Sequence, residues 1–187
     1  MSLINVITVS VEVASLIASN SKLTNALGYD GTYSYYTSLA NAISDAASTE
    51  TVITLINDTT EHDLTISSDK NIKLDLNGHT IDANYLGRLF NNAGTLTIDD
   101  STATTLEDGT YVAGKLINGT LYSVTPDNTP SADKSVGNGI YNSGTLTINN
   151  GIISGCIQKD GKGAGNGGGI FTTGKSGKGT VYLNGGS

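Results

Sequence analysis

The chain has 187 residues and a formal net charge of −7, because 17 Asp and Glu outnumber 10 Lys and Arg. This length allows one domain with a substantial hydrophobic core. The deficit of basic residues argues against nucleic acid as a partner, since phosphate contacts require Lys and Arg. No apolar run reaches the roughly 18 residues that a membrane span needs. Cys156 is the only cysteine, so an internal disulfide is excluded.

Residues 1–35 form a leading segment with its own character. Residues 5–13 alternate between apolar and polar side chains, and this period of two predicts a strand. Residues 18–34 are small and polar, with turn signals at Gly28 and at Asp30-Gly31. The apolar start lacks a basic region and contains Glu12, so it does not resemble a signal peptide.

Residues 36–48 predict a short amphipathic helix. Thr37 or Ser38 is suited to its N-cap, because a hydroxyl oxygen there accepts a hydrogen bond from a free backbone N–H group. The apolar residues at helical spacing are Tyr36, Leu39, Ala40, Ile43 and Ala47.

Four short runs repeat along the rest of the chain, and they superpose without gaps: 73–77, 95–99, 145–149 and 180–184. Each run has two apolar positions that we expect to face a core, and each ends in Asn or Asp. The expected core residues are Leu74, Leu96, Leu146 and Val181 at the first position, and Leu76, Ile98, Ile148 and Leu183 at the second. The preceding segments also match, since Phe90-Asn91-Asn92-Ala93-Gly94 is similar to Ile140-Tyr141-Asn142-Ser143-Gly144.

The spacing of these runs predicts a solenoid. Their shortest step is 22 residues, which suits one coil of three short strands and turns rather than one hairpin. Coils stacked about 4.8 Å apart place equivalent residues above one another and join the apolar positions into one core. The final residues of the runs would then form a column at a turn, where stacked amides hydrogen-bond between coils. This predicted ladder consists of Asn77, Asp99, Asn149 and Asn184.

The longer steps between runs, of 50 and 35 residues, indicate insertions at about 101–137 and 155–169. Within the first insertion, 115–117 and 120–122 flank Asn118-Gly119. This residue pair favours a type I′ turn, so we expect a hairpin there.

Three segments carry a family resemblance: Ser38-Leu39-Ala40-Asn41-Ala42-Ile43, Val52-Ile53-Thr54-Leu55 and Leu74-Asp75-Leu76-Asn77-Gly78-His79-Thr80-Ile81. Together they resemble the opening of right-handed parallel β-helix proteins of the pectate-lyase-like superfamily. In that family an amphipathic helix plugs the N-terminal end of the stack. The later Gly139-Ile140-Tyr141-Asn142-Ser143-Gly144-Thr145-Leu146-Thr147-Ile148 is similar to repeats of bacterial surface adhesins and phage tail spikes. The resemblance covers about 36–187, and it implies an all-β fold.

We therefore expect a right-handed parallel β-helix solenoid of about five coils over 49–187, a capping helix at 36–48 and an N-terminal extension at 1–35. The last run ends at Asn184 and is followed directly by Gly185-Gly186-Ser187. Solenoids need caps, so we expect either that more coils follow or that a partner covers this end.

Carboxylates are the first candidates for chemistry. The resemblance implies that catalytic acids of the family's lyases and hydrolases lie on an outward strand face, often with a basic partner. Asp75 is expected on such a face beside Lys73, and Asp99-Asp100 is expected at a turn. Acidic residues at turns are usually solvated, so we assign no catalytic residue. A calcium site at Asp58, Glu61 and Asp63, or at Asp99-Asp100, has suitable ligands, but no EF-hand or acidic repeat accompanies them. We expect no metal and no cofactor.

Tyrosines are the candidates for ligand binding. Aromatic rings that stack on sugars suggest Tyr111, Tyr122 and Tyr141 as glycan contacts.

We expect a non-enzymatic structural or adhesive module on a virion or at the cell surface. The favoured version is a phage appendage (a fibre, spike or decoration) that residues 1–35 anchor to other structural chains. The alternative is a bacterial surface adhesin that binds glycans, and a minor alternative is a polysaccharide lyase or hydrolase. A homo-oligomer stays open.

Overall fold

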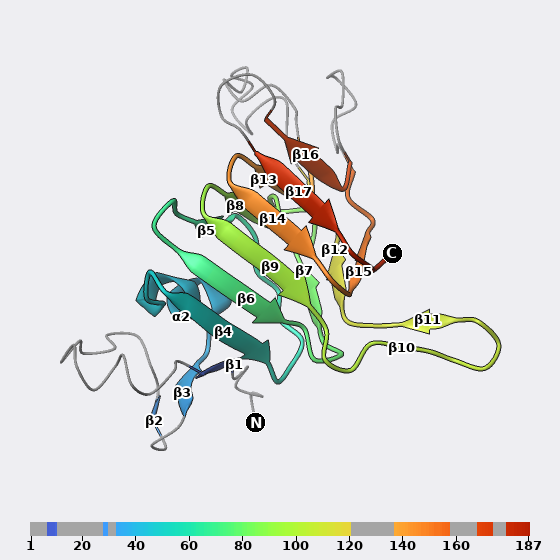
Figure 1. Cartoon of the computed structure of the whole chain (residues 1–187), viewed down its shortest axis with the longest axis horizontal. Coiled ribbons are helices and arrows are strands. Elements are labelled where there is room, and N and C mark those ends of the chain that lie inside the picture. Colours follow the sequence, from blue (N-terminus) through green and yellow to red (C-terminus); the bar gives the residue numbers. More distant parts are fainter. Residues whose placement is uncertain (1–6, 11–27, 30–32, 121–136, 158–167, 174–178) are drawn as a thin grey trace.

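The computed structural model describes residues 7–10, 28–29, 33–120, 137–157, 168–173 and 179–187. Most of the regular structure is β (Figure 1). The first elements are β1 (Ile7–Ser10), β2 (Gly28–Tyr29), β3 (Tyr33–Tyr36), α2 (Leu39–Asp45), β4 (Glu50–Leu55), β5 (Leu64–Ile66), β6 (Asn71–Asp75), β7 (Thr80–Asp82) and β8 (Phe90–Asn92). They are followed by β9 (Thr95–Asp99), β10 (Thr104–Thr105), β11 (Tyr111–Val112), β12 (Lys115–Ile117), β13 (Ile140–Asn142), β14 (Thr145–Ile148), β15 (Ile152–Ser154), β16 (Ile170–Thr172) and β17 (Thr180–Leu183).

Three parallel ladders of strands stack along the molecule. Sheet A contains β4, β6, β9, β14 and β17, sheet B contains β7, β12 and β15, and sheet C contains β5, β8, β13 and β16. The chain visits the sheets in rotation, A then B then C, and each round adds one strand to each sheet. We call one round a rung. In the first rung, Thr59 takes the place of a sheet B strand through a parallel bridge to Ile81.

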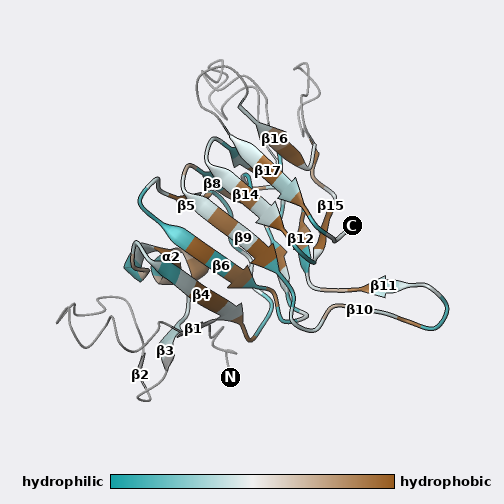
Figure 2. Ribbon diagram, in the orientation of Figure 1, coloured by the Kyte–Doolittle hydropathy of each residue, from teal (hydrophilic) through white to brown (hydrophobic). Residues whose placement is uncertain are grey.

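Strand formation follows from the alternation of side chains. Along β6 and β9 every second residue is buried, and the residues between them are half-buried polar or charged side chains. The bands of apolar and polar colour along the strands of sheet A show this alternation (Figure 2). The apolar residues of all three sheets meet in one core between them, which is why short strands with few residues per face suffice.

The register of sheet A agrees with the alignment of three runs and corrects the fourth. Strand β14 pairs with β9 and with β17 so that Leu146 lies between Leu96 and Val181. In β6, however, Leu74 lies opposite Ile98 and not opposite Leu96, which pairs with Ile72. The shift is two residues. Apolar residues alternate over five positions from Ile72 to Leu76, and a slip of two keeps the same face inward, so the pattern alone does not define the register.

Six of the eight expected core residues are buried. Val181 is half-buried and Leu183 is 67% exposed, because both lie in the last strand of sheet A. The buried six are Leu74, Leu76, Leu96, Ile98, Leu146 and Ile148.

Helix α2 is shorter than the predicted 36–48, since Tyr36 belongs to β3. Ser38 is the N-cap, and its hydroxyl oxygen accepts a hydrogen bond from Asn41 N at 3.4 Å. The helix buries Leu39, Ala42 and Ile43 against the core. No helix in the described ranges has the length and apolar character to cross a membrane.

The N-terminal strands extend sheet A. Strand β1 pairs antiparallel with β4 on one side and with β3 on the other, and β2 pairs with β3. The described parts of residues 1–35 therefore cover the outer edge of the first strand of the stack.

The predicted hairpin around Asn118-Gly119 is wrong for its described residues. Strand β12 lies parallel between β7 and β15 in sheet B, and Thr120 forms a parallel bridge with Ile157. Asn118 has the positive φ of 60° that its residue type favours, but it turns the chain at a corner of the rung. The hairpin in this insertion is an arm of β10 and β11, which projects from the side of the stack (Figure 1). Tyr122 and most of the second predicted insertion lie outside the described residues.

Candidate functional site

The carboxylates on the outward face of sheet A are committed to local hydrogen bonds. Asp75 and Asp99 lie opposite each other, and Lys73 Nζ is 3.2 Å from Asp99 Oδ2. Asp75 Oδ1 accepts hydrogen bonds from Asn77 N at 3.0 Å and from Ser101 N at 2.9 Å. Both carboxylates therefore hold turns of the chain in place.

The pKa of Asp99 supports this assignment. Partial burial opposes ionisation, but hydrogen bonds from Asn150 and Asp100 N, together with Lys73, outweigh it and lower the pKa below its ordinary value. A general acid at neutral pH needs a raised pKa. Asp99 therefore stays ionised.

Asp100 is buried and joins the arm to the stack. Its Oδ1 accepts hydrogen bonds from Gly78 N at 3.2 Å and from Thr102 N at 2.8 Å, and its Oδ2 accepts one from Gly114 N. Burial opposes ionisation here as well, but these donors lower the pKa. The residue holds both ends of the arm in place.

The predicted ladder forms only in part. Asn184 Nδ2 donates to Asn149 Oδ1 at 2.9 Å, so the last two members pair as expected. Asn77 is not in their column, because the register of β6 places Asp75 there; its amide donates instead to Leu55 O at 3.0 Å. Asp99 accepts from Asn150 at 3.0 Å.

A second amide ladder, inside the core, was not anticipated. Asn92 Nδ2 donates a hydrogen bond to Asn142 Oδ1 at 2.7 Å, and Asn142 Nδ2 donates one to Thr180 O at 3.0 Å. Among the described residues, Asn92 Oδ1 has no hydrogen-bond partner, and the residue opposite Asn92 in the rung below is the apolar Ile66. The signal was present in the sequence, since the matched segments 90–94 and 140–144 align these two asparagines.

Tyr141 packs within a stack of side chains on the outward face of sheet C. Its ring lies 5.8 Å from that of Phe171 with an interplanar angle of 21°, and the Arg88 guanidinium carbon is 4.9 Å from its centroid. The Tyr141 ring therefore already contacts two side chains of its own chain, Arg88 and Phe171.

Arg88 is itself held from two sides. It is buried, its Nε donates to Gly137 O at 3.0 Å, and its Nη1 donates to Asn91 Oδ1 at 2.9 Å. A small hollow of about 230 Å³ lies beside it, lined by Thr65, Arg88, Asn91, Asn92, Ala93, Tyr141 and Ser143.

Tyr111 fastens the arm to the stack. Its hydroxyl donates to Asn150 Oδ1 at 3.3 Å and accepts from Gly151 N at 3.1 Å. Of the three tyrosines proposed for ligands, two therefore have contacts within the chain, and Tyr122 lies outside the described residues.

The proposed calcium ligands have other partners. Glu61 accepts hydrogen bonds from Leu39 N at 2.6 Å and Ala40 N at 3.0 Å, so it caps the first turn of α2. Asp58 Oδ1 accepts from Thr80 N at 2.9 Å, and Asp63 Oδ2 lies 2.9 Å from His62 Nδ1. Within the described part of the chain, no group of three or more His, Cys, Asp or Glu is placed to hold a metal ion.

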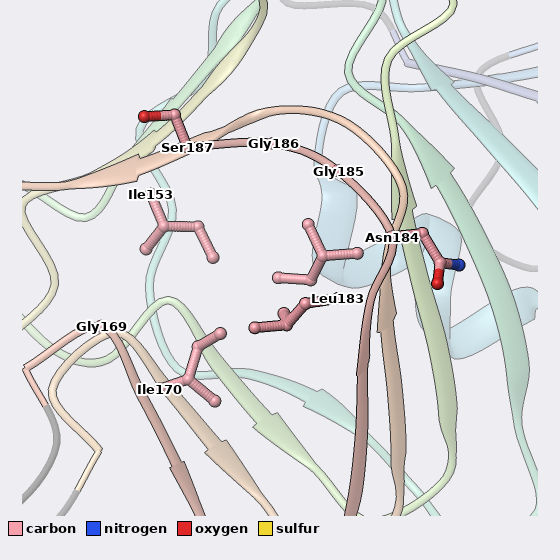
Figure 3. A pocket seen from close by; sticks show the side chains of 9 residues that line it. Ile153, Gly169, Ile170, Leu183, Asn184, Gly185, Gly186 and Ser187 are labelled. Atoms are coloured by element: carbon pink, nitrogen blue, oxygen red, sulfur yellow. The ribbon is translucent and has the colours of Figure 1, made fainter.

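A larger hollow, of about 490 Å³, lies at the end of the stack beyond the last rung. Ile153, Ile170 and Leu183 point into it from sheets B, C and A (Figure 3). Among the described residues, β17 pairs with β14 alone, so its other edge has no strand beside it. We call this surface the open end. Its lining is Ile148, Ile153, Gly169, Ile170, Leu183, Asn184, Gly185, Gly186 and Ser187.

No family model matches the sequence, and neither a curated protein nor a solved structure matches it.

Proposed function

We propose that the chain is a right-handed parallel β-helix module with a structural or adhesive role outside the cell and no catalytic activity. The rotation of the chain through three parallel sheets, with residues in register from rung to rung, supports the β-helix. Crossover connections between parallel strands are right-handed in about 98% of cases, which supports the handedness.

The observation that carries the structural role is the use of the polar and aromatic side chains. Asp75 and Asp99 accept hydrogen bonds at turns, Tyr111 bonds the arm to the stack, and the ring of Tyr141 contacts Arg88 and Phe171. The residues that suggested an active site or a sugar site thus stabilise the stack, while its open end presents apolar side chains.

We propose a virion appendage as the setting, with a neighbouring structural protein bound through residues 1–35. This placement rests on the resemblance to phage tail spikes. Strand β1 occupies the edge of β4, so the described part of that segment serves the chain itself, and the rest of the segment would make the contact.

The glycan-binding alternative rests on the hollow beside Arg88 and Tyr141. Calorimetric titration with neutral and acidic oligosaccharides, combined with an assay for release of oligosaccharides from polymers, separates the alternatives. The structural proposal predicts neither binding nor release. Binding that is lost in Tyr141→Ala and kept in Tyr182→Ala, an exposed tyrosine on sheet A, would replace it with the adhesin. Release that Asp75→Ala or Asp99→Ala abolishes would replace it with the enzyme.

A further inference from the structure

The arm, residues 101–113, is an insertion at one corner of the stack, and its base is held firmly. At the same corner of the next rung, the connection between β14 and β15 consists of residues 149–151 alone. Buried Asp100 accepts hydrogen bonds from both ends of the arm, and Tyr111 donates one to Asn150. Beyond this base the arm projects from the side of the stack (Figure 1). The fold therefore presents the arm in a fixed orientation.

One face of the arm is apolar and exposed. Thr104 lies opposite Val112, so Leu106, two residues further along, shares their face. Leu106 is 48% exposed and Val112 is 45% exposed. Tyr111 belongs to the other face and contacts Asn150 of the next rung, so the apolar face is turned toward the preceding rung. The structure describes that preceding rung at this corner, and both apolar side chains are still exposed.

The tip of the arm is acidic. Glu107 and Asp108 lie there, and both are exposed. Residues 99–114 contain no Lys, Arg or His. A short two-stranded ribbon is only marginally stable in water by itself, and exposed apolar side chains add to its need for a partner. The partner that fits the arm has an apolar face and a cation opposite the tip.

The base of an arm from a second copy meets both requirements. Lys115 follows the arm directly and is exposed on β12. The carboxylates at the base are already engaged, because Asp99 Oδ2 is 3.2 Å from Lys73 Nζ and Asp100 is buried among its hydrogen-bond donors. Each arm therefore has carboxylates at its tip and a cation at its base, a pattern that is complementary to itself when two arms lie antiparallel.

We propose that the arm binds the arm of a second copy of this chain, antiparallel about a two-fold axis, with the apolar faces in contact. Leu106 of each copy then lies over Val112 of the other, because Leu106 is nearer the tip and Val112 is nearer the base. The same arrangement brings Glu107 of each copy to Lys115 of the other, and the two-fold axis repeats both contacts. The formal net charge of −7 opposes association of two copies, so their contact is confined to a surface where opposite charges meet.

The experiment measures only mass, so it can fail independently of the glycan assays that test the proposed function. Sedimentation velocity of the 187-residue chain over a range of concentrations should show a weak, reversible dimer, because an arm offers less surface than a standard interface. Leu106→Asp should raise the dimer dissociation constant by about 30-fold, since a two-fold interface contains the substitution twice. Leu86→Asp is the matched control, because Leu86 is 55% exposed and lies between β7 and β8. It should dimerise like the unmodified chain.

Exchange of charges tests the antiparallel arrangement. Glu107→Lys or Lys115→Glu alone should weaken the dimer by about tenfold, because each sets like charges opposite each other twice. The double variant should restore the dimer, since the charges are then exchanged in both copies. Glu107 and Lys115 are exposed, so the circular dichroism spectrum should stay unchanged.

Four results would overturn the proposal: a monomer at every concentration, assemblies larger than a dimer, a dimer that Leu106→Asp does not weaken, or a double variant as weak as the single variants. The first of these would mean that a different protein binds the arm.

Discussion

The two ends of the stack differ in what covers their last apolar side chains. At the first rung, α2 covers the core, and β1 pairs with β4. At the last rung, the edge of β17 has no described strand beside it, and Leu183 is 67% exposed. Apolar side chains that occupy equivalent positions in the repeated runs are thus buried in the inner rungs and more exposed in the last one. The comparison teaches that a residue in stacked parallel strands is stabilised by the neighbouring rung as much as by its own strand.

The largest expected effect compares one leucine from each end. Leu39→Ala should lower the free energy of unfolding by about 2–5 kcal/mol, because the substitution leaves a cavity under the helix. Leu183→Ala should change it by less than about 0.5 kcal/mol, since the side chain is mostly in water. Urea denaturation at low protein concentration measures both values. Equal losses would contradict the contrast between the ends.

The next prediction compares two asparagines. Asn142 is fully buried in the amide ladder, whereas Asn184 is exposed at the open end. Asn142→Ala should cost about 1–3 kcal/mol, because Asn92 and Thr180 O lose a buried partner. Asn184→Ala breaks the same type of bond in contact with water, and it should cost less than about 0.5 kcal/mol. The same denaturation series tests this pair, and a larger loss for Asn184 would show that the open end is covered in solution.

The strand registers show how much of the fold the sequence predicts. The parallel strands 95–99, 145–148 and 180–183 align in the sequence as they pair in the structure. The alignment of β6 was off by two residues, because its alternating pattern fits both registers equally well. The type I′ signal at Asn118-Gly119 was right only for Asn118, which has a φ of 60°, because Gly119 does not have the positive φ that this turn also needs. Parallel pairing on both sides of β12 replaces the hairpin.

The candidate sites were harder to predict than the strands. Tyr141 is a residue type that often stacks on sugars, and only the fold brings Arg88 and Phe171 into contact with its ring. The matched segments 90–94 and 140–144 align Asn92 with Asn142. Alternation in the sequence does not show which polar residues of a rung face the core, so the amide ladder could not be predicted from that alignment alone.

Besides the N-cap Ser38, the Glu61 carboxylate caps the first turn of α2, and its loss gives a smaller predicted effect. Glu61→Gln should lower the free energy of unfolding by about 1 kcal/mol, because it removes the charge that accepts hydrogen bonds from the first turn of α2. Glu50→Gln changes an exposed residue at the start of β4 and serves as the matched control. Thermal unfolding followed by circular dichroism measures both, and a loss no larger than that of the control would remove Glu61 from the cap.

The smallest expected effect is a pH dependence of stability, and it concerns Asp99, which lies in sheet A between the two ends of the stack. In the column of sheet A that contains Asp75, Asp99 and Asn149, Asp99 titrates and Asn149 does not. Burial opposes ionisation of Asp99, but Asn150, Asp100 N and Lys73 lower its pKa in the folded chain. A lowered folded pKa adds stability above the unfolded pKa of about 3.9, and this stability is lost as the pH falls through the folded value. Asp99→Asn should therefore be less stable than the unmodified chain at pH 7.

The difference in stability between the two proteins should shrink as the pH falls from about 4 through the lowered pKa of folded Asp99, because the carboxylate becomes protonated over that range and its charge no longer contributes. Urea denaturation at a series of pH values from 7 to 2.5 measures this difference. If the stability difference did not change with pH, the Asp99→Asn variant would be less stable because its amide cannot form the same hydrogen bonds as the carboxylate. The charge of Asp99 would then contribute nothing, and Asp99 would differ from Asn149 only in its hydrogen bonds.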